Sequence, residues 1–507
     1  MGSENATVTG RKTKNLFSLI REPIQWVRML SSQLNPTFVM GVFIVYGLGQ
    51  GFSGSLFKVV ADYYWKDVQK VQPSTVQLYV GFYFIPWVLK PLWGILTDAF
   101  PVRGYRRRPY FLISGAIGAV STAIVSLEGN LAAAAALLCF LGLSASLAIA
   151  DVTIDACIAR NSIEVRALAP DLQSLCGFCS GAGALVGYLA SGFFVHLLGP
   201  QVRNESARFQ EFNLSLGLLA LSPAFTIVLG FVIYENRTSG LHTEKKQISQ
   251  SVAESVGTTI RSMYQTMRYP QVWKPSLYMF LALALNITIH EGHFYWYTDP
   301  KAGPAFSQEF VGVIYAIGAV ASLIGVLIYH KALKDYAFRD LVFYAQLLYG
   351  ISGVLDLFFI LRWNLIIGIP DYVFVVIEES ATRITSKIRW MPMMVLSTQL
   401  CPLGIEGTFF ALLMCIDSIG SLFSKWGGGV LLRLLHITRT DFTNLWLAAL
   451  IRDMLRFAIL ALVFLVPKAG QYEQLLPSEV SEKNATDKPD EETLELVPIN
   501  GNTLVQI

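Results

Sequence analysis

Two aspartates, Asp151 and Asp155, lie four residues apart in the otherwise apolar run Ala150-Asp-Val-Thr-Ile-Asp-Ala. On a helix, this spacing places both carboxylates on one face. Charges inside a membrane helix are costly and normally face the bundle interior or a water-filled cavity. Burial and mutual repulsion favour the protonated form of at least one aspartate, which suits a proton carrier. Substrate or proton binding is the preferred interpretation, and the alternative is an ion pair with Arg160 or with the arginines of 103–108.

A second group of ionisable residues follows in the segment 378–392. Glu379, Arg383 and Lys387 fall at i, i+4 and i+8, so one acid and two cations share a helical stripe, and Arg389 follows closely. We expect the acids of the earlier helix to face these cations across a polar pathway. The alternative is a salt-bridge ladder that merely solubilises the charges.

Isolated ionisable residues mark two further helices. Lys90 lies midway along an apolar stretch, where its ammonium cannot easily reach the membrane surface, so we expect it in a cavity. His290, Glu291 and His293 lie near the end of another apolar stretch, where an outer gate or a proton entry is favoured over a metal site. No loop collects a catalytic constellation, so we predict no enzyme activity, no metal and no cofactor.

A charged loop connects two of the apolar stretches. Asp98 is followed by a basic cluster made up of Arg103, Arg106, Arg107 and Arg108. Asp98 could pair with these arginines and with the positive N-terminus of a nearby helix. Such a latch could hold two halves of a protein together in one state and release them in another. The alternative is a simple cytoplasmic anchor.

The composition indicates what must position these residues. The chain has 507 residues, of which 53% are hydrophobic and 15% charged, whereas soluble proteins carry about 25% charged residues. Twelve helices of about 20 residues would need roughly 240 residues. We therefore predict an all-α membrane protein with twelve transmembrane helices, expected near 36–58, 75–97, 109–127, 131–159, 170–198, 213–234, 274–294, 307–330, 340–361, 372–400, 404–434 and 444–467.

Lys and Arg are concentrated in alternate loops, which places both termini in the cytoplasm. The net charge of +3 gives no argument for nucleic acid, and the six cysteines lie in apolar stretches that argue against a disulfide framework. The predicted organisation is a basic cytoplasmic N-terminus (1–35), a six-helix bundle (36–234), a cytoplasmic linker (235–273), a second six-helix bundle (274–467) and an acidic, disordered cytoplasmic tail (468–507).

The two halves share an internal repeat. Residues 64–108 align without gaps onto 295–339, and twelve of the 45 positions are identical, including Pro73/Pro304, Gly81/Gly312 and Arg108/Arg339. Two parallel six-helix repeats form a transporter architecture, with the substrate site between the halves near the midplane.

Several motifs together resemble the folate–biopterin transporter family of the major facilitator superfamily. They are the loop Asp98 to Arg108 with its Gly-Tyr-Arg-Arg-Arg run, the run Asp151 to Asp155, Pro170-Asp-Leu-Gln-Ser, and Trp390-Met-Pro with Cys401-Pro. The resemblance spans roughly 36–467 and implies proton-coupled uptake, a symport, of folates or pterins. We expect the protein to be a monomer. The absence of a long Ser/Arg-rich transit peptide favours the plasma membrane or an endomembrane over the chloroplast envelope.

The implied ligand suggests roles for the charged residues. A pterin presents an amino group and a ring N–H side by side, and one carboxylate, Asp151 or Asp155, could accept both. The glutamate tail of a folate would need Arg383, Lys387 or Arg389. Trp87, Trp390, Tyr83 and Phe84 are possible stacking partners. Two alternatives stay open: transport of another small organic anion, and a non-transporting membrane receptor or scaffold.

Overall fold

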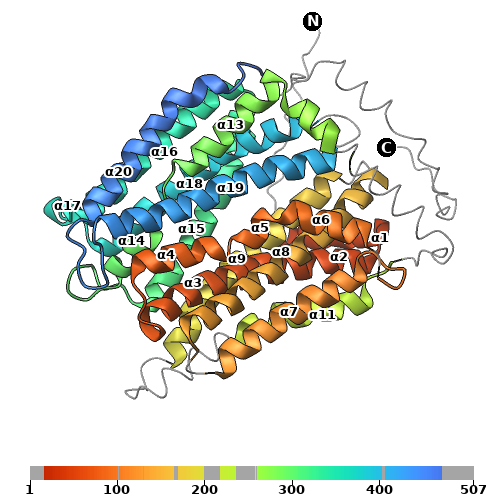
Figure 1. Cartoon of the computed structure of the whole chain (residues 1–507), viewed down its shortest axis with the longest axis horizontal. Helices are drawn as coiled ribbons and strands as arrows, with labels where there is room; N and C mark the ends of the chain where they lie inside the picture. The colour runs from red at the N-terminus through yellow and green to blue at the C-terminus, as the bar shows by residue number, and fades with distance from the viewer. Residues whose placement is uncertain are drawn as a thin grey trace, which may run out of the picture. The chain divides into compact units, whose positions relative to one another are not determined.

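The computed structural model describes residues 16–100, 102–128, 131–164, 169–198, 217–235, 257, 260–401 and 406–470, with some side chains omitted within these ranges. The described residues form helices (Figure 1) and contain no strand beyond an isolated bridge between Val102 and Tyr105. The prediction of an all-α protein is therefore confirmed. The acidic tail from residue 471 and most of the linker lie outside the described residues, whereas part of the basic N-terminus forms helix α1 (Leu16–Gln33).

Eight helices among the described residues are long and apolar enough to cross a membrane. They are Pro36–Val68, Pro73–Thr97, Arg108–Leu127, Ala133–Ile158, Ser174–Gly192, Gln308–Leu333, Phe338–Ile360 and Phe409–Leu434. The four other expected positions also hold helices. One is short (Gly217–Val232), one is broken near residue 286, one is the polar helix carrying the predicted cations, and the last is formed by Leu445–Ala458 and Ile459–Leu465.

The chain divides into two compact units. Unit 1 comprises Met1–Gln72, Phe82–Leu241 and Tyr297–Ala319, and unit 2 comprises Pro73–Gly81, His242–Trp296 and Val320–Ile507. The first half of the chain thus contributes Pro73–Gly81 to unit 2, and the second half contributes Tyr297–Ala319 to unit 1. The two exchanged segments include the aligned pairs Pro73/Pro304 and Gly81/Gly312, so the exchange follows the internal repeat.

Unit 1 is built mainly from α1 (Leu16–Gln33), α2 (Pro36–Val42), η1 (Phe43–Ser53), α3 (Gly54–Tyr63), η2 (Tyr64–Val68), α5 (Ile85–Val88), α6 (Lys90–Ala99), α7 (Arg108–Leu127), α8 (Ala133–Glu164), α9 (Ala169–Leu198) and α11 (Leu221–Val232), with the first part of α15 (Gln308–Ile328). Helix α7 packs against α8 and α11, and it lies beside α11 in Figure 1. The buried core includes Phe38, Phe111 and Ile154.

The contact between η1 and α9 depends on glycine. A Cβ atom added to Gly183 would lie 2.1 Å from the Gly47 carbonyl oxygen, and one added to Gly51 would lie 2.6 Å from the Ser180 carbonyl oxygen. Real Cβ atoms do not approach backbone oxygens this closely, so only glycine allows the two helices to pack at this distance. The close packing places the polar residues of η1 at a defined position opposite α8.

Unit 2 is built mainly from α4 (Pro73–Phe82), α13 (Pro270–Ala284), α14 (His290–Tyr297), η4 (Tyr329–Leu333), α16 (Phe338–Ile360), α17 (Trp363–Ile366), α18 (Asp371–Gln399), α19 (Glu406–Leu434), α20 (Leu445–Ala458) and η5 (Ile459–Leu465). Helix α16 packs against both α18 and α20, and α13 packs against α19. The buried core includes Tyr278, Phe338 and Phe409.

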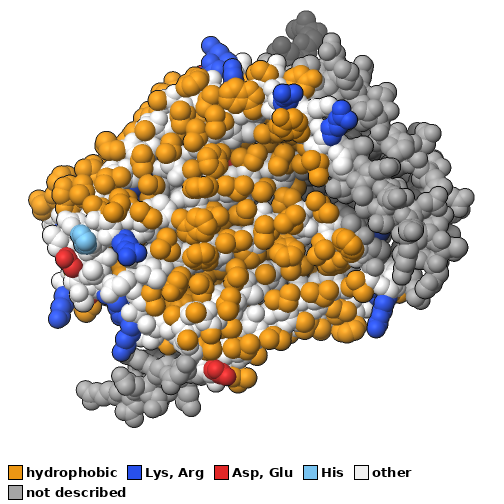
Figure 2. Space-filling model, in the orientation of Figure 1, with side chains coloured by type: hydrophobic (Ala, Val, Ile, Leu, Met, Phe, Trp, Pro, Cys, Tyr) orange, Lys and Arg blue, Asp and Glu red, His pale blue; other side chains and the backbone are white. Residues whose placement is uncertain are grey.

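Hydrophobic side chains cover most of the visible surface of the described helices, while Lys and Arg lie toward the margins of the view (Figure 2). Val120 and Leu127 of unit 1 and Ile351 and Phe464 of unit 2 are among the exposed apolar side chains. Exposed apolar surface on this scale is typical of helices that face lipid.

Candidate functional site

The two predicted aspartates of α8 bind polar residues of η1. The Gln50 side-chain amide donates a hydrogen bond to Asp151 Oδ1, and the Tyr46 hydroxyl donates one to Asp155 Oδ1. Lys90 Nζ forms an ion pair with Asp151 Oδ2. Asp151 is buried, whereas Asp155 is half-buried. The structure thus brings together three residues predicted from sequence and adds Tyr46 and Gln50, which sequence reasoning missed.

Matched spacing explains this arrangement. Tyr46 and Gln50 are four residues apart on η1, as Asp151 and Asp155 are on α8, and the contacts run in opposite order along the two helices. The segment η1 is a π-helix, a rare form that often occurs at functional sites. A polar residue every fourth position within an apolar stretch was the signal that could have identified Tyr46 and Gln50.

Lys90 reaches the site because the second transmembrane helix is interrupted. Leu89 leaves helical geometry, with φ −81° and ψ 9°, so α6 restarts at Lys90. The Lys90 ammonium lies 4.8 Å from the centroid of the Trp87 ring, and Trp87 Nε1 donates to Ser144 Oγ of α8 at 3.1 Å. The tryptophan therefore links the interrupted helix to α8 and supports Lys90 beside Asp151.

The ion pair explains part of the charge in this site but leaves an excess. Two carboxylates, Asp151 and Asp155, stand against one ammonium, Lys90. Both Asp151 oxygens have partners, whereas Asp155 Oδ2 receives no hydrogen bond from the described residues. The alternative partner Arg160 has its side chain outside the described residues. Asp155 is therefore the carboxylate with capacity for a further donor.

The predicted stripe on α18 contains one ion pair and one unpaired cation. Arg383 Nε lies 2.7 Å from Glu379 Oε1, as expected for a ladder. Lys387 Nζ lies 4.9 Å from the centroid of the Trp390 ring, and no carboxylate of the described chain pairs with it. The stripe is thus only partly neutralised within its own helix.

Arg389 is buried, and its contacts differ from those of Arg383 and Lys387. Its guanidinium lies 4.5 Å from the centroid of the Tyr349 ring, and its NH1 group donates at 3.4 Å to the Ala282 carbonyl and to Gln346 Oε1. Its Nε is buried without a hydrogen-bond partner in the part of the chain that the structure describes. A buried guanidinium with an unsatisfied donor is a candidate anion site.

Unit 2 also contains a buried charge network that sequence reasoning missed. Arg452 of α20 lies 2.6 Å from Asp356 of α16 and 2.9 Å from Asp453, its neighbour in the chain. Arg456 lies 3.6 Å from Asp453, and His293 Nε2 lies 3.1 Å from Asp356 Oδ1. The two arginines and two aspartates are all buried, so the acids and cations compensate one another in a setting where an isolated charge would be costly.

The network continues to Tyr349. Arg456 donates to the Tyr349 hydroxyl at 3.1 Å and to Asn286 Oδ1 at 3.0 Å, and its guanidinium lies 4.4 Å from the Tyr349 ring centroid. Two arginines, Arg389 and Arg456, therefore lie close to one tyrosine ring. The run Arg452-Asp-Met-Leu-Arg456 inside an apolar helix carried the same kind of signal as Asp151 and Asp155.

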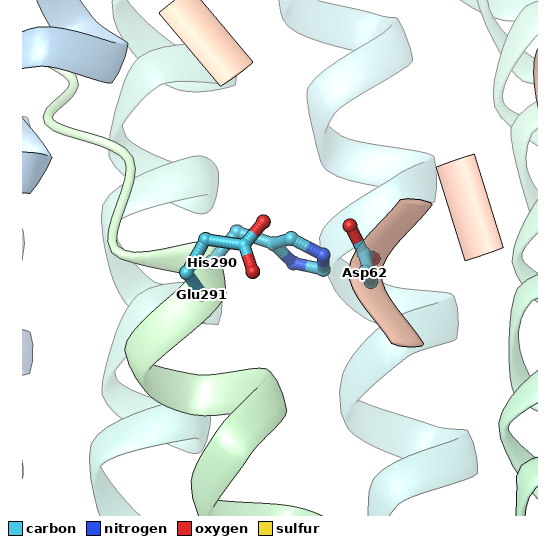
Figure 3. A group of neighbouring side chains, drawn as sticks. All are labelled: Asp62, His290 and Glu291. Carbon is cyan, nitrogen blue, oxygen red and sulfur yellow. The ribbon is translucent and has the colours of Figure 1, made fainter. Parts of the chain in front are cut away.

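The three residues of the expected outer cluster, His290, Glu291 and His293, all lie on α14 but do not share the same contacts. His290 and Glu291 occupy successive positions of α14, and Asp62 comes from α3 (Figure 3). Glu291 is buried, and its backbone N–H donates to Gln77 Oε1 at 3.1 Å. Asp62 belongs to unit 1 and the other two to unit 2, whereas His293 joins Asp356 in the buried network of unit 2.

The basic loop is bound to the end of α11. The Glu235 carboxylate accepts hydrogen bonds from the backbone N–H groups of Arg106, Arg107 and Arg108 at 2.6–3.1 Å. These N–H groups lie at the N-terminus of α7, where a carboxylate satisfies unpaired donors and favours the helix dipole. Glu235 was predicted only as the start of the linker.

The side chains of the predicted latch have defined partners as well. Arg108 Nε and NH2 donate to the Ile233 and Phe231 carbonyls, each at 2.9 Å. Arg107 NH1 donates to Thr97 Oγ1 at 2.7 Å, whereas Arg106 is exposed and Arg103 occupies a turn with φ 54°. The side chain of Asp98 lies outside the described residues, so the latch itself stays a prediction.

Comparison with known proteins identifies the family of this chain. The BT1 family matches residues 50–487. A protein of Arabidopsis thaliana named "Probable folate-biopterin transporter 6" is 59% identical over 486 residues, which cover 96% of this chain and 94% of that protein. "Probable folate-biopterin transporter 2" of the same plant is 46% identical over 477 residues, covering 94% of this chain and 92% of that protein.

A solved structure supports the fold. The nucleoside transporter NupG matches with a TM-score of 0.60 at 14% identity, covering 85% of this chain and 99% of that one. The fold is therefore of the major facilitator type, as the resemblance implied. The chain belongs to the BT1 family, and it is a multi-pass membrane transporter rather than an enzyme.

Proposed function

We propose that this chain is a secondary active transporter of folates or pterins that works by alternating access and couples uptake to protons. The names of its similar relatives support the substrate class. The observation that carries the proposal is the membrane-embedded set of Lys90, Asp151 and Asp155 with Tyr46 and Gln50. A transporter needs such polar groups inside an apolar bundle, whereas a scaffold would not.

Asp155 is the better placed of the two aspartates to bind a pterin. The amino group and ring N–H of a pterin present two parallel donors, which a carboxylate accepts in a bidentate pair. Both oxygens of Asp151 already have partners, whereas Asp155 accepts a hydrogen bond only from the Tyr46 hydroxyl among the described residues. Asp151 then acts mainly by holding Lys90 and Gln50 in place.

The excess negative charge of the same set suits proton coupling. With one ammonium for two carboxylates, a proton on Asp155 would remove the repulsion between Asp155 and Asp151. Binding of substrate and binding of the proton would then affect the same carboxylate. A protonated Asp155 could still accept from the pterin amino group with one oxygen and donate its O–H to a ring nitrogen, so substrate and proton could bind this group together.

The anionic tail of a folate would be bound by cations of α18. Lys387 has no carboxylate partner among the described residues, and Arg389 has a buried, unsatisfied Nε. Arg383 is already paired with Glu379, so it contributes less to the net positive charge. Other small organic anions could use the same unmatched cations, which makes their transport the second candidate function.

The decisive experiment measures uptake of radiolabelled folate and biopterin in a transport-deficient cell, with and without a protonophore. We expect uptake of at least one ligand, sensitivity to the protonophore, and loss of uptake in Asp151→Asn and Lys387→Ala at normal membrane abundance. Unlabelled organic anions added as competitors test the second candidate. Wild-type uptake in both variants would contradict the assigned site, and absence of uptake in the wild type would contradict the proposed function.

The membrane and the oligomeric state follow as further parts of the proposal. A plasma-membrane or endomembrane location and a monomeric transporter agree with the sequence expectation. A fluorescent fusion observed in plant cells would test the location, because signal in the chloroplast envelope would contradict it. Light scattering of the detergent-solubilised protein would test the monomer.

A further inference from the structure

Lys58 is a cation inside the first membrane span that has no acidic partner among the residues described by the structure. It lies on α3, is half-buried, and its Nζ lies 4.3 Å from the centroid of the Tyr315 ring. None of the described carboxylates forms an ion pair with it, including Asp62 one helical turn further along α3. Cations within membrane helices normally pair with another group or face a water-filled space. Lys58 therefore has the capacity to bind an anion.

The surroundings of Lys58 are aromatic and belong to unit 1. Tyr315 is buried, and its hydroxyl lies 2.9 Å from the Tyr297 hydroxyl, which holds the ring in position. The Tyr188 ring centroid lies 5.5 Å from that of Tyr315. Ring faces compensate an ammonium only partly, because they carry no net negative charge. A carboxylate would complete the site.

Lys58 continues the line of polar residues that contacts the aspartates. Tyr46, Gln50 and Lys58 are separated by multiples of four residues. In an α-helix, each step of four residues turns the side chain by about 40° around the axis. The wider turn of the π-helix η1 counteracts this drift, so the three side chains stay on a similar face.

The charge near Tyr46 and Gln50 is opposite in sign to the charge at Lys58. The set formed by Lys90, Asp151 and Asp155 carries one excess negative charge, which repels a carboxylate. Lys58 is eight residues beyond Gln50, or about 12 Å along the helix axis. An elongated ligand with a hydrogen-bond-donating ring at one end and a carboxylate at the other would match both signs.

We propose that Lys58 binds a carboxylate of the substrate, so that unit 1 recognises both the ring and the acidic tail of a folate-type ligand. The inference rests on the proposed function, which assigns the ring to Asp155. It differs from the α18 assignment because it places a tail contact on the same unit as the ring contact. A pterin without a carboxylate would not use Lys58.

The test compares two ligands on one purified protein. Equilibrium binding of folate and of biopterin is measured in detergent for the wild type, Lys58→Met, Lys58→Arg and the control Lys70→Met, which removes an exposed lysine after the same membrane span. Loss of a charge-assisted hydrogen bond should weaken folate binding by about tenfold to a hundredfold in Lys58→Met. Biopterin binding should stay within about twofold, and Lys58→Arg and Lys70→Met should retain folate binding.

The alternative outcomes separate this inference from the proposed function. If Lys58→Met weakens both ligands equally, or neither, the carboxylate contact is wrong and the proposed function stands. If the wild type binds biopterin but not folate, recognition of the tail is wrong. If the wild type binds neither ligand, the proposed function fails and this inference fails with it. Lys58→Gln, which keeps a polar side chain, replaces Lys58→Met if that variant does not fold, and the same two-ligand comparison decides.

Discussion

Arg108 and Arg339 make the same contact in the two units of this protein. Arg108 donates from Nε and NH2 to the Ile233 and Phe231 carbonyls, and Arg339 donates from Nε and NH2 to the Val466 and Phe464 carbonyls at 2.8 and 3.2 Å. The two arginines are equivalent in the sequence alignment of the halves. Each satisfies carbonyl groups at the end of the last membrane helix of its own half.

We expect Arg108→Ala to lower the stability of the protein by about 1–3 kcal/mol, because it removes charge-assisted hydrogen bonds to a helix end. Arg339→Ala should have a similar effect through the equivalent contact. The measurement is the thermal unfolding midpoint in detergent. Arg106→Ala is the matched control, because Arg106 is exposed on the same loop, and an equal loss of stability in the control would contradict the role of Arg108.

The same variants also test the latch. If the basic loop controls the transport cycle, Arg106→Ala together with Arg108→Ala should change the rate of uptake while the equilibrium affinity for folate stays within about twofold of the wild type. Uptake kinetics and equilibrium binding measured on one preparation separate the two effects. A change in ligand affinity alone would exclude the latch.

The ion pair between Lys90 and Asp151 predicts a specific pattern of defects. Lys90→Met leaves two carboxylates without a cation, and Asp151→Asn removes the carboxylate that contacts Lys90 directly, so each variant should reduce uptake by at least about tenfold. The double variant leaves one carboxylate instead of two and should therefore fold better than Lys90→Met. Membrane abundance and thermal stability of the three variants test this, and an additive loss in the double variant would show that the pair is not coupled.

Asp155 should carry the proton dependence. Wild-type uptake is expected to increase as the external pH falls, because a proton on this carboxylate relieves its repulsion with Asp151. Asp155→Asn mimics the protonated form permanently, so its residual transport or exchange should no longer depend on pH. Tyr46→Phe, which removes only the hydrogen bond to Asp155, is the comparison variant and should keep a pH dependence. A full pH dependence in Asp155→Asn would place the proton elsewhere.

The buried network of unit 2 should contribute to stability as a unit. Asp356→Asn or Arg452→Met alone breaks a buried ion pair of 2.6 Å and should cost about 3–5 kcal/mol. The double variant should recover part of this loss, because no uncompensated charge remains between the two positions. A double-mutant cycle based on unfolding midpoints measures the coupling. Zero coupling energy would mean that the pair does not act together.

Much of this arrangement was predictable from local patterns. Hydrophobic runs identified the positions of the helices, because each span must bury or expose about 20 apolar residues in the bilayer. The four-residue spacing of Asp151 and Asp155 predicted a shared face, and their contacts with η1 agree with it. Asp356, Arg452 and Arg456 were not singled out from the sequence, although each is an ionisable residue within an apolar run.

The contact partners of the charged residues were not predictable in the same way. Arg383, Lys387 and Arg389 appeared as one group, yet Arg383 binds Glu379, Lys387 lies over Trp390, and Arg389 packs on Tyr349. Residues 383 and 387 share a face, whereas position 389 points to a different neighbour. The partners of Arg389 come from α13 and α16, which lie far from α18 in the sequence.

An all-helical membrane protein with two related halves could be predicted directly from the chain, because composition, apolar run length and the internal repeat do not depend on how the helices pack. The folded protein was needed to show that Lys90 pairs with Asp151, that Tyr46 binds Asp155 and that Arg452 contacts two aspartates. These choices depend on which helix faces come together, and helix packing is set by side chains far apart in the chain. The broken second helix at Leu89 and the π-helix η1 bring the polar groups into register.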